Sequence, residues 1–246
     1  MRFIDSHVHL SDYKDPRQLI ALSRANGTLL LSAGIDKDTS GRTLDLAKGD
    51  PDVVRAFVGV HPSEVRDEPD LIWMEAALRS ASGVGEIGLD PKYSAAGPNS
   101  SQMKAYVAQL AAAEKSGKPV QVHSRGAEKA CLDTLAGFRL KSVLMHWFQG
   151  EALLGALHDR AYLMSFGPAL IYSKRLQKMA ASLDPKLVLS ETDGPVAFEA
   201  LGGGKGPPLI PSVVFALSRA WKVSFEDARK VVIQNGLRFL GARGKG

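Results

Sequence analysis

The sequence predicts an α/β protein, a (β/α)8 barrel of the TIM type that forms a single domain. Three observations support this prediction. Short runs rich in β-branched and aliphatic residues alternate with stretches of helical spacing along the whole chain. Near-continuous apolar strands of this kind are typical of a parallel sheet that helices cover. Eight such units in 246 residues, a length typical of this fold, favour a closed barrel over an open sheet.

The expected strands follow one another at intervals that leave room for a helix. They are Phe3–His7, Thr28–Ala33, Val53–Val60, Gly83–Leu89, Pro119–His123, Ser142–His146, Ala161–Phe166 and Leu187–Thr192. Helical spacing follows most of them, as in Pro16–Asn26, Leu71–Ala81, Gln102–Ser116, Glu128–Ala136 and Ser173–Ser182.

The C-terminal part carries two extra helical stretches, Ser212–Trp221 and Phe225–Phe239, which we expect to close the outer ring. The Gly/Pro cluster Gly202–Pro208 is similar to a linker in composition. It comes just after the last strand, however, where a barrel carries a functional loop. We therefore assign one domain over residues 1–246.

Composition and charge predict a soluble, cytoplasmic protein. Cys131 is the only cysteine, which excludes an intrachain disulfide and fits a reducing compartment. The N-terminus carries histidines and an aspartate where a signal peptide needs an apolar run, and no apolar stretch approaches the ~20 residues of a membrane span. The net charge of +5 is compatible with a nucleic-acid partner, but it is also common among ordinary enzymes. We expect a monomer with no membrane partner.

Titratable residues gather at the ends of the expected strands. Of the six histidines, five occupy this position, namely His7, His9, His61, His123 and His146. Glu86 and Asp193 share it, whereas His158 lies in a helical stretch. Because the carboxyl ends of all strands meet at one face of a parallel barrel, these distant residues should converge. Each alone suits a surface histidine, a core hydrogen bond or an ion pair, but together they favour a metal site.

The residue types and their spacing fit ligands of divalent cations. His7 and His9 are two positions apart, so they share one face of an extended strand and can reach one cation. Glu86 lies between glycines, and its two oxygens can bridge two cations. Four imidazoles and two carboxylates suffice for two cations with water at the open positions, which is typical of a catalytic site. Mixed nitrogen and oxygen donors suit Zn, Mn, Co or Fe better than Mg, and we leave the identity open among Zn, Mn, Mg and Co.

Seven motifs occur in a fixed order, namely Ile4–Leu10, Gly59–Pro62, Gly85–Asp90, Val122–Arg125, His146–Gly150, Glu191–Pro195 and Asn235–Phe239. As an ordered set they resemble the TatD family of metal-dependent deoxyribonucleases, within the amidohydrolase-like barrels. The resemblance spans nearly the whole chain.

The resemblance implies how the ligands divide between two cations. One cation would have the ligands His7, His9, Glu86 and Asp193, and the other Glu86, His123 and His146. Asp193 would also orient or deprotonate the attacking water, so Asp193 and Glu86 are the expected catalytic residues. Glu191 shares the strand face of Asp193 one layer deeper and suits support of a ligand better than direct binding.

Five residues are expected to bind substrate. His61 matches a family position near the substrate phosphate, and the guanidinium of Arg125 can contact a phosphate oxygen. Tyr93 and Trp147 can stack on a base. Lys205 is the one cation in the glycine-rich loop after the last strand, where the family usually has arginines. The segment around Tyr93 also departs from the family, which often has paired aromatics there.

The predicted function is hydrolysis of phosphodiester bonds, in DNA that is single-stranded or frayed at its ends, with two divalent cations activating water. Two alternatives stay open. Related barrels hydrolyse esters, lactones or amides, for example by removing an aminoacyl group from tRNA, but many use a modified lysine where this chain has Glu86. The third possibility is a non-catalytic binding protein with structural metals, which the coordination capacity left for water disfavours.

Overall fold

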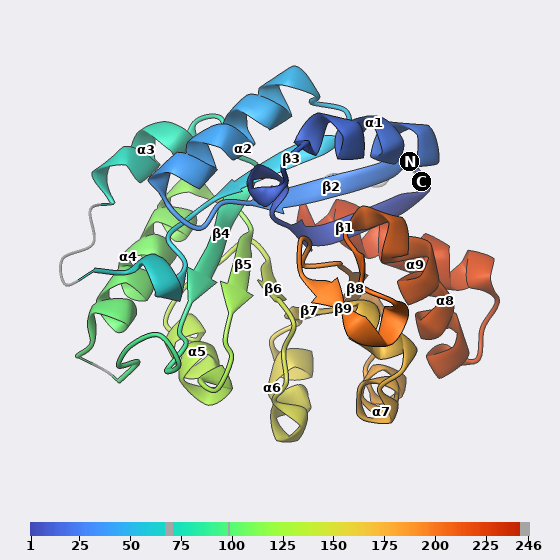
Figure 1. Cartoon of the computed structure of the whole chain (residues 1–246). Coiled ribbons are helices and arrows are strands. Elements are labelled where there is room, and N and C mark those ends of the chain that lie inside the picture. Colours follow the sequence, from blue (N-terminus) through green and yellow to red (C-terminus); the bar gives the residue numbers. More distant parts are fainter. Residues whose placement is uncertain (67–70, 98, 242–246) are drawn as a thin grey trace.

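The computed structural model describes residues 1–66, 71–97 and 99–241, and its centre is one sheet of eight parallel strands (Figure 1). The strands pair in sequence order and are β1 (Phe3–Val8), β2 (Thr28–Ala33), β3 (Val54–Val58), β4 (Gly83–Gly88), β5 (Val120–His123), β6 (Val143–Met145), β7 (Leu163–Phe166) and β8 (Val188–Ser190). All eight predicted strands occur, most of them shorter than expected. The predicted barrel fold is confirmed, while the extent of the domain over 1–246 stays a prediction.

The barrel is nearly closed between its first and last strands. Ser190 Oγ donates to the carbonyl oxygen of Ile4 at 2.7 Å. Further along, the backbone N–H of Asp193 donates to the carbonyl of His7 at 2.9 Å. These bonds hold the end of β8 against β1, although the two strands share no regular ladder in the described residues.

Helices follow the strands and cover the outside of the sheet (Figure 1). They are α1 (Pro16–Asn26), α2 (Lys37–Gly49), α3 (Ile72–Leu78), α4 (Ser101–Ser116), α5 (Glu128–Leu135), α6 (Leu154–Asp159), α7 (Lys174–Ser182), α8 (Ile210–Trp221) and α9 (Phe225–Phe239). The helical stretches expected from the sequence did not include α2 or α6. The sequence of α2 is mostly polar, and its N-terminus is set by Asp36, which forms a capping box with Thr39. The helix α6 has only six residues.

The last two helices pack on the seam of the barrel, with α8 and α9 both against β1 and β8. Asn235 of α9 ties this helix to the sheet, because its side-chain amide donates to the carbonyl of Val188 at 2.7 Å. Gly236 lets the helix approach closely, since a Cβ there would lie 2.3 Å from Ile4 Cδ1. The C-terminal helices therefore fix the strands that carry His7 and Asp193.

The loop between β8 and α8 is partly ordered by a short hairpin. Its strands β9 (Ala197–Phe198) and β10 (Gly204–Lys205) pair in antiparallel fashion. The hydroxyl of Tyr13 lies against this loop, since a Cβ on Gly206 would be 2.3 Å from Tyr13 Oη and one on Gly194 would be 2.1 Å from it. The glycine-rich segment thus packs against the turn after Asp193 and is not a linker.

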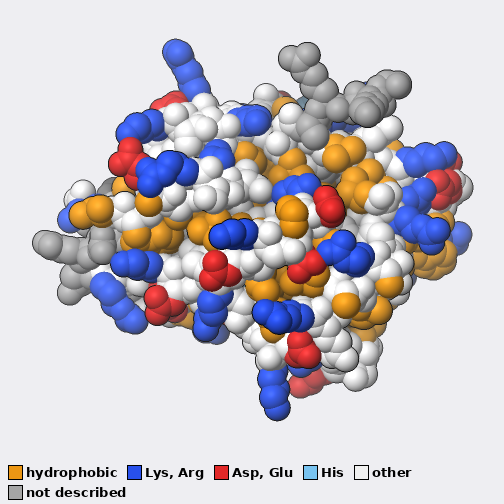
Figure 2. Space-filling view, turned by 90° about the horizontal axis from the view of Figure 1, so that it is seen from above, with side chains coloured by type: hydrophobic (Ala, Val, Ile, Leu, Met, Phe, Trp, Pro, Cys, Tyr) orange, Lys and Arg blue, Asp and Glu red, His pale blue; other side chains and the backbone are white. Residues whose placement is uncertain are grey.

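Figure 2 shows the face of the molecule over the first helices, where lysines and arginines are interspersed with acids and apolar side chains. On this face the positive net charge is not gathered into one patch. Within residues 1–66, 71–97 and 99–241, no helix has both the length and the apolar content that crossing a bilayer requires.

Candidate active site

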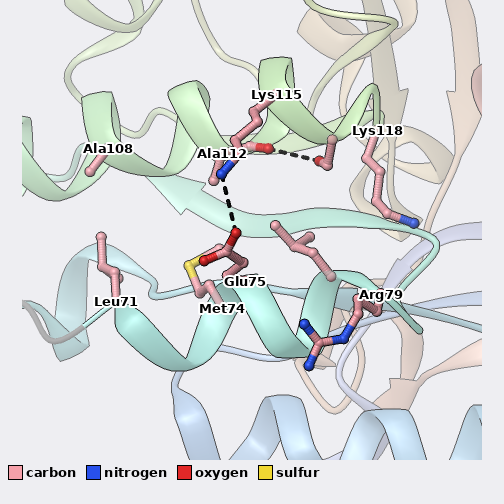
Figure 3. A pocket seen from close by; sticks show the side chains of 10 residues that line it. Leu71, Met74, Glu75, Arg79, Ala108, Ala112, Lys115 and Lys118 are labelled. Atoms are coloured by element: carbon pink, nitrogen blue, oxygen red, sulfur yellow. Dashed lines mark hydrogen bonds and ion pairs between the residues drawn. The ribbon is translucent and has the colours of Figure 1, made fainter.

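Two cavities of about 660 Å³ each differ in the chemistry of their lining. One lies on the outside of the barrel between α3 and α4 (Figure 3). Of the described residues that line it, none is a histidine, and Glu75 is paired with Lys115 at 3.1 Å. The other lies at the carboxyl ends of the strands, and its lining includes His9, Glu86 and Asp193. The candidate active site is this second cavity.

The two oxygens of Glu86 face different histidines. Oε2 lies 3.4 Å from His7 Nε2 and 3.3 Å from His9 Nε2. Oε1 lies 2.8 Å from His123 Nδ1 and 3.7 Å from His146 Nε2. The carboxylate, 3% exposed, therefore stands between two groups of ring nitrogens, as a ligand shared by two cations must.

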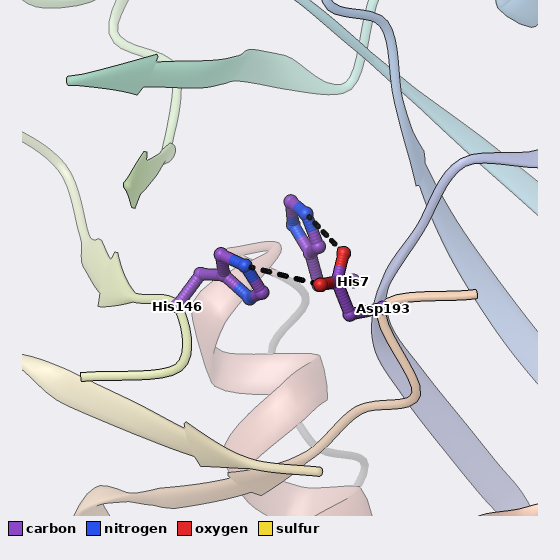
Figure 4. A group of neighbouring side chains, drawn as sticks. All are labelled: His7, His146 and Asp193. Carbon is purple, nitrogen blue, oxygen red and sulfur yellow. Dashed lines mark ion pairs between the residues drawn. The ribbon is translucent and has the colours of Figure 1, made fainter. Parts of the chain in front are cut away.

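Asp193 completes the first of these groups. Its Oδ1 lies 3.3 Å from His9 Nε2 and 3.7 Å from His7 Nε2, while Oδ2 is 3.9 Å from His146 Nε2. Figure 4 shows the carboxylate of Asp193 beside the rings of His7 and His146. These two rings are stacked, with their centroids 3.8 Å apart. The structure thus brings together all six predicted ligands. In three sets of residues, one donor atom from each member lies within 4.8 Å of those of the other members. The sets are His7–His146–Asp193, His7–His9–Glu86 and His61–Glu86–His123.

Three of the histidines are held with Nε2 toward the centre of this cluster. The Nδ1–H group of His7 donates to Gln121 Oε1 at 2.9 Å, and that of His9 donates to the carbonyl of Ala33 at 3.0 Å. His146 donates from Nδ1 to Glu191 Oε2 at 2.7 Å. An acceptor on Nδ1 leaves the lone pair of a neutral ring on Nε2. These partners therefore prepare three rings to bind a cation.

The other two rings of the cluster, His123 and His61, are oriented differently: His123 faces Glu86 with Nδ1, and His61 has its Nδ1 turned toward Ser63. His123 Nε2 lies 2.8 Å from Asp90 Oδ2, so its Nδ1 is the nitrogen that faces Glu86. In His61 the Nδ1 atom accepts from the backbone N–H of Ser63 at 3.1 Å, which places the proton of the neutral ring on Nε2. The Nε2–H of His61 points into the site, 3.6 Å from Glu86 Oε1. His61 thus offers a hydrogen-bond donor to the cavity.

The charges in the cluster balance one another. Burial raises the pKa of Glu86, but the neighbouring His61 and His7 rings and hydrogen bonds from His123 and His7 outweigh it and hold the pKa well below its ordinary value. Burial acts against the positive charge on His146, but Glu191 and Asp193 raise the pKa of this ring to about 9. Burial lowers the pKa of His7 and lowers that of His61 to about 4, so these two rings favour the neutral form, whereas a cation that binds His146 must displace a ring proton.

The donor set fits divalent cations. Four imidazoles and two carboxylates converge, and each ligand ring has a partner on its other nitrogen. Such partners orient metal-binding rings and fix their tautomers. Oε2 of Glu191, which faces His146 Nδ1, also accepts from Ser165 Oγ at 2.6 Å, and the supporting role of Glu191 stays a prediction.

Two residues of the site have left-handed backbone, with φ of 40° at Trp147 and 49° at Asp193. This conformation is unfavourable for residues with a Cβ, although aspartate tolerates it better than most. Trp147 lies two residues past the end of β6 and Asp193 three residues past the end of β8, and both line the cavity. Non-glycine residues in this region often occur at functional sites.

The predicted substrate-binding residues separate into two groups. His61, Tyr93, Arg125 and Trp147 line the cavity. The guanidinium carbon of Arg125 lies 5.4 Å from the centre of the Tyr93 ring, a cation–π contact. Lys205 lies on β10 and is not among the described residues that line the cavity. The substrate-binding roles of all five stay predictions.

Sequence reasoning missed several residues of the site. Gln121 supports His7, and it could have been found because it shares the strand face of His123 two positions earlier. Asp90 contacts His123, and as an acid just past the end of β4 it met the same rule that selected Asp193. Asp12, at the end of a 3-10 helix (Leu10–Asp12), and Gln149, in the loop after β6, also line the cavity, but no strand-end pattern marks them.

Comparison with known proteins agrees with this geometry. The family model described as "TatD related DNase" matches residues 4–241. The 3'-5' ssDNA/RNA exonuclease TatD of Edwardsiella piscicida is 34% identical over 245 residues, which cover 92% of this chain and 93% of that protein. An uncharacterized metal-dependent hydrolase of Methanocaldococcus jannaschii, MJ1582, is 23% identical over 252 residues, covering 99% of this chain and 98% of that one.

Among solved structures, the TatD homologue YJJV of Escherichia coli superposes with a TM-score of 0.86 at 22% identity and covers 97% of both chains. This likeness bears on the fold, and the sequence matches bear on the family. On the family match over nearly the whole length and the relative at 34% identity, the chain belongs to the TatD-related DNase family and is a metal-dependent hydrolase.

Proposed function

We propose that this protein hydrolyses phosphodiester bonds in DNA, in single strands or at frayed ends, with two divalent cations. The observation that carries the proposal is that each oxygen of Glu86 faces its own group of histidine nitrogens. The relative at 34% identity, named as a single-stranded DNA and RNA exonuclease, supports the choice of substrate.

In this proposal the ligands divide as the motifs imply. One cation would be held by His7, His9, Glu86 and Asp193, and the other by Glu86, His123 and His146. Bound cations supply stabilisation of negative charge on a phosphoryl oxygen and lower the pKa of water.

The chain's own residues supply the rest of the chemistry. The carboxylate of Asp193, whose side chain is 14% exposed, stands at the cavity wall and accepts the proton of the attacking water. The Nε2–H of His61 donates to a phosphate oxygen, because Ser63 keeps Nδ1 occupied as an acceptor. Arg125 neutralises a second phosphate oxygen with a charge-assisted hydrogen bond.

Trp147 suits a base of the substrate. Its ring lies 5.9 Å from that of Phe198, which is buried at 5% exposure and supports the indole from the β9–β10 hairpin. A held indole gives a stacking surface that every base can use, so this contact favours a substrate without strong sequence preference.

The test combines metal analysis with cleavage assays. The purified protein, stripped and reloaded with Mn²⁺ or Mg²⁺, is offered single-stranded DNA, blunt duplex and duplex with frayed ends at low salt. We expect two bound equivalents and faster cleavage of the single-stranded and frayed DNA, with binding that weakens as salt rises. No cleavage of any DNA would reject the proposal, and turnover of carboxylic esters or lactones in the same panel would support the alternative hydrolase.

Two substitutions with matched controls test the roles within the site. Asp193→Asn should reduce kcat about 100- to 10,000-fold while the protein stays folded, because a proton acceptor is lost. Asp159→Asn is its control, since that side chain is 80% exposed. His146→Ala should lose bound metal, whereas the exposed His158, replaced in the same way, should not. Equal effects in a pair would contradict the assignment.

A further inference from the structure

Asp90 joins a ring of the proposed metal centre to the arginine at the cavity wall. One oxygen, Oδ2, lies 2.8 Å from His123 Nε2. The same oxygen lies 2.9 Å from Arg125 Nε and 2.7 Å from one of its terminal nitrogens. The side chain of Asp90 is 1% exposed, while that of His123 is 15% exposed and that of Arg125 is 46% exposed. No donor set of the described residues that could hold a cation includes Asp90.

The position of this carboxylate is itself fixed. The N–H of Asp90 donates to Gln102 Oε1 at 2.8 Å, and its carbonyl accepts from Gln102 Nε2 at 2.9 Å. The second oxygen, Oδ1, accepts from the backbone N–H of Lys92 at 2.9 Å. Backbone and side chain are thus held from three sides, and Oδ2 has a single place to lie.

For His123, this contact decides which nitrogen is available. Both ring nitrogens of His123 face a carboxylate oxygen at 2.8 Å, Nδ1 that of Glu86 and Nε2 that of Asp90, and a carboxylate oxygen only accepts. A cation shared with Glu86 would take the place of the proton on Nδ1, while Asp90 keeps the proton on Nε2. The Nδ1 atom faces Glu86 at 2.8 Å. His7, His9 and His146 have the opposite arrangement, with Nε2 facing the centre. Without Asp90, nothing in the described structure would select Nδ1 of His123.

For Arg125, the contact fixes the direction of an otherwise mobile group. The side chain is 46% exposed and has many rotamers in free solution. Asp90 holds one edge of the guanidinium, and the ring of Tyr93 lies against it. Because Asp90 and Tyr93 hold the guanidinium, its remaining N–H groups are oriented before a substrate arrives. Arg125 lines the cavity, so these groups are available to a substrate there.

We propose that Asp90 is a positioning residue that sets two groups at once through a single oxygen. It presents Nδ1 of His123 to one cation and aims the free edge of Arg125 at a phosphate oxygen of the substrate. The part that concerns Arg125 rests on the proposed function, whereas the part that concerns His123 requires only that the centre binds a cation.

The test is Asp90→Asn. An asparagine has one acceptor oxygen, so it cannot serve the donors on both sides, namely Lys92 on one and His123 with Arg125 on the other. We expect the affinity for Zn²⁺, measured by calorimetry on the metal-free protein, to fall about 10- to 100-fold for one of the two sites. In ¹⁵N NMR spectra of the zinc-loaded protein, the Nε2–H signal of His123 should shift and exchange faster with water, while the other three ligand rings stay unchanged.

Two further variants separate positioning from general damage. Asp159→Asn makes the same chemical change at a side chain that is 80% exposed, and it should leave the zinc affinity and the His123 signal unchanged. In a double-mutant cycle with Arg125→Ala, the rise in KM for single-stranded DNA should be less than additive, because Asp90→Asn has already freed the guanidinium.

Unchanged zinc affinity and an unchanged His123 signal in Asp90→Asn would overturn the inference, as would the same losses in Asp159→Asn. Additive effects on KM would overturn the part that concerns Arg125. Since zinc binding and NMR need no DNA, a protein that cleaves no DNA would reject the proposed function and leave the role of Asp90 toward His123 separately tested.

Discussion

Replacing Gly206 by alanine is expected to destabilise the protein in two separable ways. Gly206 has φ of 73° and ψ of −169°, a backbone region that is essentially restricted to glycine, and holding an alanine there costs about 1–3 kcal/mol. A Cβ there would also lie 2.3 Å from Tyr13 Oη, and forcing a methyl group into such a contact costs about 1–3 kcal/mol. The ring has little room to yield, because its oxygen also lies against Gly194, where a Cβ would be 2.1 Å away.

Together these costs predict a loss of about 2–6 kcal/mol in the free energy of unfolding, or about 4–24 °C in Tm for a chain of this size. Tyr13→Phe removes the atom that clashes. Because Tyr13 Oη is buried without a hydrogen-bond partner among the described residues, this change alone should cost less than about 1 kcal/mol. In the Tyr13→Phe background, Gly206→Ala should then lose only the backbone part, about 1–3 kcal/mol.

The assay is urea unfolding of the wild type, the two single variants and the double variant. The difference between the Gly206→Ala penalties in the two backgrounds is the coupling energy, and we expect about 1–3 kcal/mol. Equal penalties in both backgrounds would refute the packing of the glycine-rich loop on Tyr13. A large penalty from Tyr13→Phe alone would show that its hydroxyl has a partner after all.

Three further predictions concern the centre and the core. Glu191→Gln should weaken Zn²⁺ binding about 10- to 100-fold in a calorimetric titration. The reason is that a neutral amide holds the His146 Nδ1 proton less firmly than the carboxylate, which lies 2.7 Å away. An affinity equal to that of the wild type would contradict this role of Glu191. Stripping the metal with EDTA should lower Tm in scanning calorimetry. A free metal concentration of 100 times Kd stabilises the folded protein by about 2.7 kcal/mol, which corresponds to about 5–11 °C in Tm for this chain. A Tm that does not depend on metal would count against the metal centre. Burial raises the pKa of the Cys131 thiol to about 12, so Ellman's reagent should react at neutral pH only after unfolding, and labelling of the folded protein would disprove its burial.

The sequence alone was enough to predict the barrel fold and to predict that the six proposed ligands lie close together. Apolar runs long enough for buried strands alternate with helical stretches, and in a parallel barrel every strand ends at the same face. The chain order therefore implies that His7 and Asp193, at opposite ends of the sequence, are neighbours. Weakly patterned elements were harder to predict, because α2 is mostly polar and begins at a cap instead of an apolar stripe.

Only the tertiary structure decided how each of these side chains is turned. The nitrogen that a histidine presents depends on the partner of its other nitrogen, and those partners come from other strands, such as Gln121 for His7 and Glu191 for His146. The position of Lys205 outside the cavity likewise follows from the hairpin and from the packing of Gly206 on Tyr13. Strand periodicity determines which face of the barrel a residue reaches, whereas ring orientation depends on hydrogen bonds between segments far apart in the chain, which no local pattern encodes.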